Sequence, residues 1–373
     1  LSGASITSLG GIDFTGVNGG AGLGAGDRGG ELTISANSLT IGPGGIAGPV
    51  SFNGGSGTTD FVAGGGGTFT VNAPGTINVN SDIEATTGVR PQNAAPSGTG
   101  GTVTLNSTNE TVTVNSRIQV SSNDAPTATP SPPPRRRTAV GGNINITSGK
   151  AGISTRAVAI NVTSSSQLLS LLAAAPTPRP GGKVTILATG ANSDINLNGR
   201  VQVDGGTVDV RHQAAGGRIN IQQPSLRPSG TVAPPQLAAD VIKAGAFGSN
   251  GQLNIGNSTL SADTLIRLYA PSSNGQLNFI ANVTLQSPNI ALAAGTVTVA
   301  SGVVVTIASQ NPANVYTNNP NYSTRNGGNN ANGGIFQGPG PLEGVNSPQP
   351  LANAPPFDSP PAGVSRAGGG GGQ

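Results

Sequence analysis

The side chains best placed for acid–base chemistry surround the only histidine of the chain, His212. Asp204 and Asp209 precede this histidine, and Arg211 is its immediate neighbour. Polysaccharide-cleaving enzymes use acidic pairs for acid–base work and for calcium, with a cation nearby. Strand alternation places Asp209 and Arg211 on one face and Asp204 at a corner. The pattern therefore favours a polar outer face with its charges in solvent over a catalytic pair.

A second acidic pair, Asp82 and Glu84, also shares a predicted strand face and could bind a cation weakly. The chain has only 15 acidic residues, most of them isolated, and its lack of cysteine excludes thiolate metal sites. We therefore expect no catalytic residue, no metal site and no cofactor, and predict that the chain is not an enzyme.

One run of charge stands out, formed by Arg135, Arg136 and Arg137 after three prolines. Clustered basic residues raise the local concentration of anions, so this run could bind phosphate or an acidic glycan. The alternative is a solvated loop tip. The other basic residues are spread thinly and the net charge is +3, which does not indicate a nucleic-acid patch.

The composition restricts the elements that could position these side chains. Among 373 residues there are 60 Gly and 29 Pro, whereas 9% of residues are charged and 3% are aromatic. Such values are unlike those of an α/β enzyme or a helical bundle. Because 34% of residues are apolar and many alternate with polar ones, disorder throughout the chain is also excluded.

A short phrase recurs along the chain: Gly-Gly or Asn-Gly, followed by alternating polar and apolar residues. Copies begin at Gly29, Gly66, Gly100, Gly141, Gly181, Gly205, Gly216, Asn250 and Asn274. Their spacing is irregular, which indicates a fixed unit with insertions of variable length.

The better copies hold three strands of about four residues each, as in residues 102–105, 111–114 and 117–120. Strands this short are stable only when stacked coils pair each one with its copies above and below. We therefore predict an all-β fold, a parallel β-helix of about 10 coils that rises about 4.8 Å per coil. The inward residues should be Val103, Leu105, Val112, Val114, Ile118 and Val120.

The insertions are predicted to follow the third strand and to leave the solenoid at one corner, at residues 87–98, 121–140, 164–180 and 222–249. Residues 167–172 and 236–243 have the composition of short helices. In the first run, Leu168, Leu169, Leu171 and Leu172 would pack on the solenoid flank or bind a partner.

The alternation stops near residue 309. We therefore divide the chain into a β-helix domain, residues 1–309, and an irregular extended tail rich in Asn, Gly and Pro, residues 310–373. Such a tail has too little apolar surface to order itself. Its expected anchors on neighbouring subunits are Tyr316, Tyr322, Phe336 and Phe357.

Several phrases, taken in order, resemble large bacterial exoproteins of the filamentous-haemagglutinin-like family. They are Ser164-Ser165-Ser166-Gln167-Leu168-Leu169, Pro180-Gly181-Gly182-Lys183-Val184-Thr185, Asn250-Gly251-Gln252-Leu253-Asn254-Ile255-Gly256, Leu268-Tyr269-Ala270-Pro271, Val283-Thr284-Leu285 and Val315-Tyr316-Thr317-Asn318-Asn319-Pro320-Asn321-Tyr322. The resemblance implies a right-handed β-helix, export through the cell envelope and a surface or extracellular location. It brings no catalytic residue with it.

These observations predict a secreted structural or adhesive protein of the bacterial cell surface that assembles with copies of itself, head to tail, into filaments or fibres. A first residue other than Met favours a processed, exported segment, and no stretch is long and apolar enough to be inserted in a membrane. Expected partners are the chain itself and cell-surface glycans, with no nucleic acid. The alternative is a carbohydrate-active β-helix, either a polysaccharide lyase or a glycan-binding module.

Overall fold

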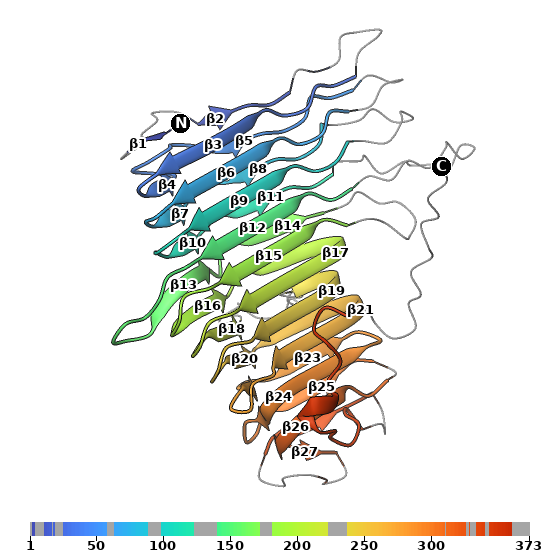
Figure 1. Cartoon of the computed structure of the whole chain (residues 1–373). Helices are drawn as coiled ribbons and strands as arrows, with labels where there is room; N and C mark the ends of the chain where they lie inside the picture. Colours follow the sequence, from blue (N-terminus) through green and yellow to red (C-terminus); the bar gives the residue numbers. More distant parts are fainter. Residues whose placement is uncertain are drawn as a thin grey trace, which may run out of the picture.

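The computed structural model describes residues 2–3, 11–16, 18, 25–57, 63–88, 98–122, 140–171, 181–222, 237–309, 311–325, 328, 333–339 and 343–359. These residues form an all-β structure in which 28 strands belong to one continuous sheet. Within the same residues, the only helix is a single 3-10 turn, η1 (Leu351–Asn353). Figure 1 shows the strands stacked from β3 near the amino terminus to β26.

The strands fall into three faces, which we call A, B and C. Face A begins with β1 (Ser2–Gly3), β3 (Glu31–Ala36), β6 (Thr68–Ala73), β9 (Thr102–Ser107), β12 (Asn143–Ser148) and β15 (Lys183–Ala188). Face B consists of β4 (Leu39–Ile41), β7 (Ile77–Val79), β10 (Val112–Val114), β13 (Ala157–Val162), β16 (Ser193–Leu197), β18 (Arg218–Gln222), β20 (Gln252–Gly256) and β22 (Gln276–Phe279). Face C consists of β2 (Ile12–Asp13), β5 (Val50–Ser51), β8 (Ile83–Glu84), β11 (Arg117–Gln119), β14 (Gln167–Ser170), β23 (Val283–Gln286), β25 (Val304–Ile307) and β28 (Ile335–Gln337), beside which lies β27 (Ser323–Thr324).

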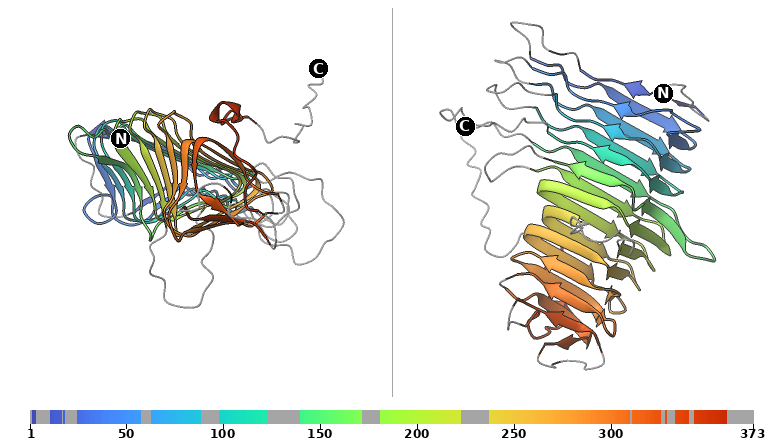
Figure 2. Two further views of the ribbon diagram at one scale, coloured as in Figure 1. Left: turned by 90° about the horizontal axis from the view of Figure 1, so that it is seen from below. Right: turned by 180° about the vertical axis from the view of Figure 1, so that it is seen from behind.

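Longer strands bend from one face into the next in the second half of the chain. Those that run from face C into face A are β17 (Arg200–His212), β19 (Leu237–Ala246) and β21 (Ser258–Ala270). Those that run from face A into face B are β24 (Ile290–Val299) and β26 (Asn314–Asn321). On every face each strand pairs in parallel with its counterparts in neighbouring coils (Figure 2), which is consistent with a β-solenoid.

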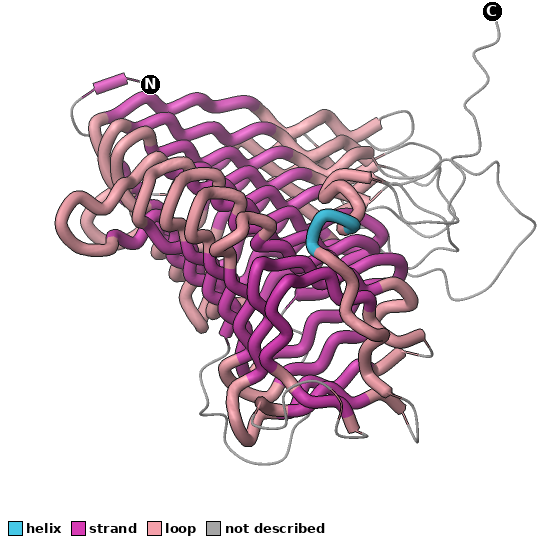
Figure 3. Tube along the Cα trace, turned by 60° about the horizontal axis from the view of Figure 1, so that its bottom comes forward, coloured by secondary structure: helices cyan, strands magenta, loops and turns pink. Residues whose placement is uncertain are grey.

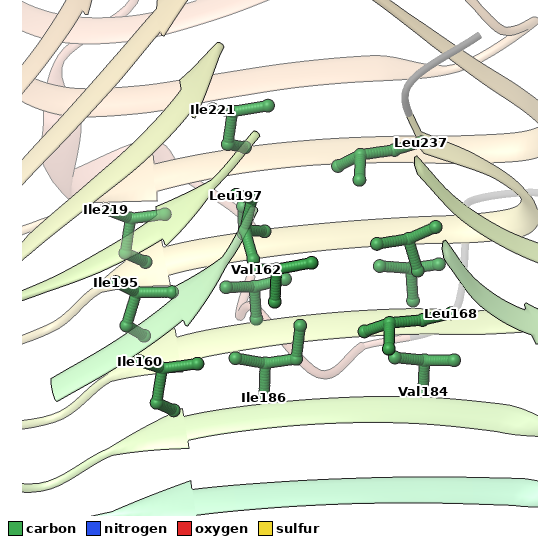
Figure 4. Packing of buried hydrophobic residues seen from close by; sticks show 14 of the residues in the cluster. Ile160, Val162, Leu168, Val184, Ile186, Ile195, Leu197, Ile219, Ile221 and Leu237 are labelled. Atoms are coloured by element: carbon green, nitrogen blue, oxygen red, sulfur yellow. The ribbon is translucent and has the colours of Figure 1, made fainter. Parts of the chain in front are cut away.

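The interior is built from the residues that the alternation predicts. Val103 pairs with Phe69 on one side and Ile144 on the other, and all three are fully buried. The six predicted inward residues are likewise fully buried, so that prediction is confirmed. Figure 4 shows how Ile160, Ile195 and Ile219 stack in one column of the interior. Inward β-branched and Leu side chains thus fix the register, because a slip of one residue would turn them outward.

The Gly phrase marks two different corners of the coil. The early copies precede strands of face A, whereas the copies at Gly216, Asn250 and Asn274 precede β18, β20 and β22 on face B. Gly216 and Asn250 have positive φ angles of 65° and 55°, a conformation that favours Gly and Asn. At the corner before face A, Gly66 and Gly100 instead lie against backbone, where a Cβ would be 2.2 Å from Ala85 O and 2.1 Å from Val120 O. The phrase thus serves two corners, which explains its irregular spacing.

The two predicted helices are a correction, because their described residues form strands. Residues 167–170 are β14, in which Leu168 pairs with Ile118 and Val201 inside the solenoid. Residues 237–246 are β19, which pairs with β17 and β21. Parallel pairing on both sides overrides local helix preference here. Parts of the predicted insertions therefore belong to the coils, while residues 89–97, 123–139, 172–180 and 223–236 lie outside the described residues.

Parallel pairing continues beyond residue 309. β26 pairs with β24, and β28 pairs with β25. Residues 343–349 then return beneath face A, where Val345 bridges to Ala313 and Gln349 bridges to Tyr316. The described part of the predicted tail is therefore held by its own chain.

Candidate functional site

The outer surface of face A changes character along the stack. Its first column of outward residues runs through Thr70, Thr104 and Asn145, and continues in register to Asp209, Lys243 and Arg267. The adjacent column runs through Asn106 and Thr147, and then through Leu187, Arg211, Gly245, Tyr269, Ala293 and Tyr316. Charged, aromatic and small side chains thus replace a ladder of Thr and Asn.

Residues 351–359, which we call the C-terminal strap, cover this altered surface. Figure 3 shows η1 of the strap lying outside the strands of the sheet. Arg267, only 3% exposed, donates through Nη1 to the carbonyl oxygens of Pro356, Phe357 and Ser359 at 2.9, 2.8 and 2.5 Å. Because a guanidinium donates from a fixed planar fork, it defines the path of the strap backbone.

Tyr269 provides a second backbone contact. Its hydroxyl donates to the carbonyl oxygen of Pro355 at 2.9 Å. Burial raises the pKa of Tyr269 to about 12, so the hydroxyl stays protonated and remains a donor over the usual range of pH.

A charge network fixes the end of the strap. Asp358 accepts from Arg211 at 2.6 Å, and Lys243 Nζ lies 3.5 Å from the same carboxylate. Arg211 also holds Asp209 through two hydrogen bonds of 2.7 and 2.9 Å, and Lys183 lies 3.1 Å from Asp209. The hydrogen bond from Arg211 holds the pKa of Asp358 below its usual value, while burial lowers the pKa of Lys243. The network therefore favours an ionised strap carboxylate.

Phe357 anchors the strap between aromatic rings. Its ring packs edge-on against Phe247 and Tyr269, with centroid distances of 4.8 and 5.5 Å, and the Arg211 guanidinium lies 5.0 Å from its centroid. Gly245 leaves room for both phenyl rings, since a Cβ there would lie 2.6 Å from Phe247 and 3.1 Å from Phe357. Beside the anchor, the strap and sheet enclose an open pocket of about 500 Å³. Its lining includes Phe247, Tyr269, Pro271, Ser273, Asn318, Leu351 and Phe357.

The predicted acid–base cluster is divided between the outside and the inside of the solenoid. Asp209 and Arg211 share the outer face as predicted, but Asp209 is only 3% exposed, so its predicted solvated position is wrong. His212 is fully buried, with its Nε2 2.9 Å from Ser193 Oγ, and burial lowers its pKa to about 4. Asp204 accepts from Gln202 at 2.9 Å. The structure therefore assigns these side chains to separate structural contacts.

The second acidic pair already holds a cation, the Arg117 guanidinium. Arg117 Nη2 lies 3.2 Å from Asp82 and also forms an ion pair with Glu84. Burial opposes ionisation of Asp82, but hydrogen bonds from Ser116 and Arg117 outweigh it and leave its pKa lowered. Among the described residues, no group of three or more His, Asp or Glu side chains is arranged to hold a metal ion.

The residues predicted to mediate assembly mostly contact their own chain. Leu168 is fully buried and Leu169 is 6% exposed, while Tyr322 and Phe336 pack edge-on in the interior. Tyr316 packs against the Tyr269–Phe357 cluster. Leu171 is half-buried. Leu172, Arg135, Arg136 and Arg137 lie outside the described residues.

Sequence reasoning missed Lys243, Arg267 and Asp358. One signal was present, namely the outward small residues Gly245, Ala291 and Ala293 at positions where earlier coils have Thr or Asn. Small outward residues in register leave space for a covering segment.

Comparison with known proteins identifies no relative: the chain matches no protein-family model, no curated protein and no solved structure. The resemblance to filamentous-haemagglutinin-like exoproteins therefore depends on the sequence phrases alone. In the part of the chain that the structure describes, no helix has the length and apolarity needed to cross a membrane.

Proposed function

We propose that the chain is a secreted structural or adhesive protein of the bacterial cell surface, which self-assembles head to tail into filaments or surface fibres. Its framework would be a right-handed β-helix of about 10 coils, a solenoid in which each coil contacts only its neighbours. Copies of such a stack can be joined end to end without changing the coils themselves.

The observation that best supports assembly is an aromatic column that ends at the surface. Phe52 stacks on Phe69 and on Phe14, each at a centroid distance of 5.3 Å. Phe52 and Phe69 are fully buried, whereas Phe14 is 41% exposed. The exposed ring therefore offers an apolar surface on which the stack could continue into a second copy.

Face B supports a structural role for the repeated coils. Asn196, Asn220, Asn254 and Asn278 form an outward ladder in which each side-chain amide donates to the preceding side chain, at 2.8, 2.9 and 3.0 Å. Such ladders are typical of regularly stacked strands. The result is a long, uncharged polar column that fits a repetitive surface contact.

The other end of the stack differs in its backbone chemistry. Pro320 lies in β26 on face B, and Pro348 and Pro350 lie in or next to the segment beneath face A. Proline lacks an N–H donor and is a common device against strand addition at an exposed edge. Assembly at this end would therefore use side-chain contacts instead of continued strand pairing on these two faces.

A glycan-binding module is the second candidate, favoured by the pocket beside the strap. Phe247, Tyr269 and Phe357 give the pocket aromatic walls, and Ser273 and Asn318 add polar groups. A lyase is less well supported because Asp209 is held by Arg211 and Lys183. Incubation with polygalacturonate and calcium should give no unsaturated product. Product that disappears in Asp209→Ala would overturn the structural proposal in favour of a lyase.

The test of the proposed function is electron microscopy of the purified chain together with sedimentation velocity. We expect filaments for the wild type and shorter species for Phe14→Asp, because a charge would prevent ring stacking between copies. Ile153→Asp is the matched control, since Ile153 is 98% exposed and lies away from the ring column. Dispersed single particles at all concentrations would contradict self-assembly.

A further inference from the structure

We propose that the C-terminal strap is exchangeable between copies, so that the strap of one chain binds face A of a second chain. This inference rests on the proposed self-assembly and names a contact that would join the copies. The ligand class is a Pro-Pro-Phe-Asp segment supplied by a second copy of this chain, residues 355–358.

Face A recognises the strap backbone through two buried donors. Arg267 binds three strap carbonyl groups, and Tyr269 binds the carbonyl group of Pro355. The bound segment forms a turn, in which Ser359 N–H donates to the Pro356 carbonyl at 3.1 Å, and its two prolines restrict the backbone before binding, so that less entropy is lost. Ala354 has φ −59° and ψ 132°, in the extended range that adjoining prolines favour.

Face A also recognises the strap side chains. The Phe357 ring fits between Phe247 and Tyr269, and Asp358 meets Arg211 and Lys243. An aromatic anchor beside a charge pair is a common composition for the centre of an interface. The site therefore selects for a defined short sequence, as a peptide-binding surface does.

The strap can leave this site without opening the interior. Phe357 and Tyr269 belong to an apolar cluster outside the solenoid, separate from the main core. An open pocket lies between strap and sheet, so the strap is not packed against the sheet along its whole length. Detachment would therefore expose the outer cluster while the coils remain paired.

The connection to the strap also suits exchange. Pro350 joins the strap to residues 343–349, and its φ of −53° and ψ of 139° are extended. Prolines in a connecting segment favour extended conformations, and exchange of an identical element creates the same contacts between copies as within one copy. Residues 343–349 would stay with their own coil, because Val345 is 4% exposed in the main core and Asn346 and Gln349 form hydrogen bonds with the adjacent strand segment.

The experiment mixes two full-length variants that are complementary. The face variant, Arg267→Met, keeps an intact strap, and the strap variant, Phe357→Ala with Asp358→Asn, keeps an intact face. Neither variant alone contains a complete site, but a mixed pair contains one. Isotope labelling of one variant lets native mass spectrometry distinguish the mixed pair from pairs of identical chains, and circular dichroism checks that each variant is folded.

We expect a 1:1 mixed complex at a level at least tenfold above the pairs formed by either variant alone, which corresponds to about 1.4 kcal/mol. If Arg267→Met does not fold, Tyr269→Phe with Lys243→Ala takes its place as the face variant. A mixture that contains no more pairs than the separate variants would overturn the inference.

The same samples separate this inference from the proposed function. Mixed pairs without wild-type filaments would support strap exchange and contradict the filament. Filaments that form equally well in the wild type and the strap variant, with no mixed pairs, would leave the filament standing and overturn the strap as its joint.

Discussion

Two stretches of face A have the same backbone pairing but outward side chains of different chemistry. In β6, β9 and β12 the outward column is Thr70, Thr104 and Asn145, half-buried residues with at most a long side-chain hydrogen bond of 3.4 Å between the last two. At the equivalent positions of β19 and β21, Lys243 and Arg267 bind the strap, and Asp209 of β17 holds Arg211, which binds it from the adjacent column. Because the inward residues fix the register, the outward positions are free to change. A binding site can therefore be added to a solenoid without altering its coils.

The interior is common to both stretches, so its disruption should have the largest effect. Val112→Asp would place an unpaired charge in the close-packed core and lower the free energy of unfolding by at least about 4 kcal/mol. Thr113→Asp, the outward neighbour, should change it by less than about 1 kcal/mol. Denaturant unfolding measures both. Equal stability of the two variants would show that the strand register is wrong.

The next effect is pH dependence arising from His212. Its pKa is about 4 in the folded chain, against 6.5 ordinarily, so the unfolded chain binds a proton that the folded chain excludes. Stability should therefore be constant above pH 6.5 and fall between pH 6.5 and 4, by roughly 3 kcal/mol in total.

The control for this dependence is His212→Ala, which has the residue found at the equivalent position in the preceding coil, Ala188. In this variant the free energy of unfolding should no longer show the decrease between pH 6.5 and 4 that protonation of His212 causes. An unchanged slope would show that other groups cause the pH dependence.

Arg267→Ala should have a larger effect than a substitution at an equivalent outward position of an earlier coil. The substitution removes the side-chain donor that three strap carbonyl groups share and should weaken docking of the strap by about 2 kcal/mol. Thr104→Ala, in the same column, should change stability by less than about 0.5 kcal/mol. Limited proteolysis of the strap reports the local effect, and cleavage at the wild-type rate in Arg267→Ala would show that Arg267 does not hold it.

The smallest effect is expected from Asp358→Asn. The Asp358 side chain is 64% exposed, so loss of its ion pairs should weaken docking by only about 0.5 kcal/mol, and less at high salt. Its lowered pKa means that this contribution persists above the ordinary carboxyl range and is lost as the pH falls through the folded value. Strap proteolysis with added salt measures it. If added salt accelerates strap proteolysis in Asp358→Asn as much as in the wild type, the ion pair is not the cause of the salt dependence.

The sequence predicts the solenoid interior well because each inward residue obeys a local rule. Val103 and Leu105 alternate with polar residues, and stacking only repeats that pattern. The runs at Leu168 and Ala238 break the alternation, so their strands become visible only through pairing with neighbouring coils.

The strap is harder to predict. Arg267 and Phe357 are separated by 90 residues, and the contact depends on a returning segment whose composition indicates no order. No local sequence pattern relates these two residues, and only the small outward residues on face A indicate a covering segment.

Hydrogen–deuterium exchange on the full chain tests the altered surface most directly. We expect protection of the strap amides that donate within the docked segment, those of Asn353, Ala354 and Ser359. Arg267→Ala should remove this protection and leave β9 and β12 as protected as in the wild type. Strap amides that exchange at the rate of an unfolded chain in the wild type would contradict the account.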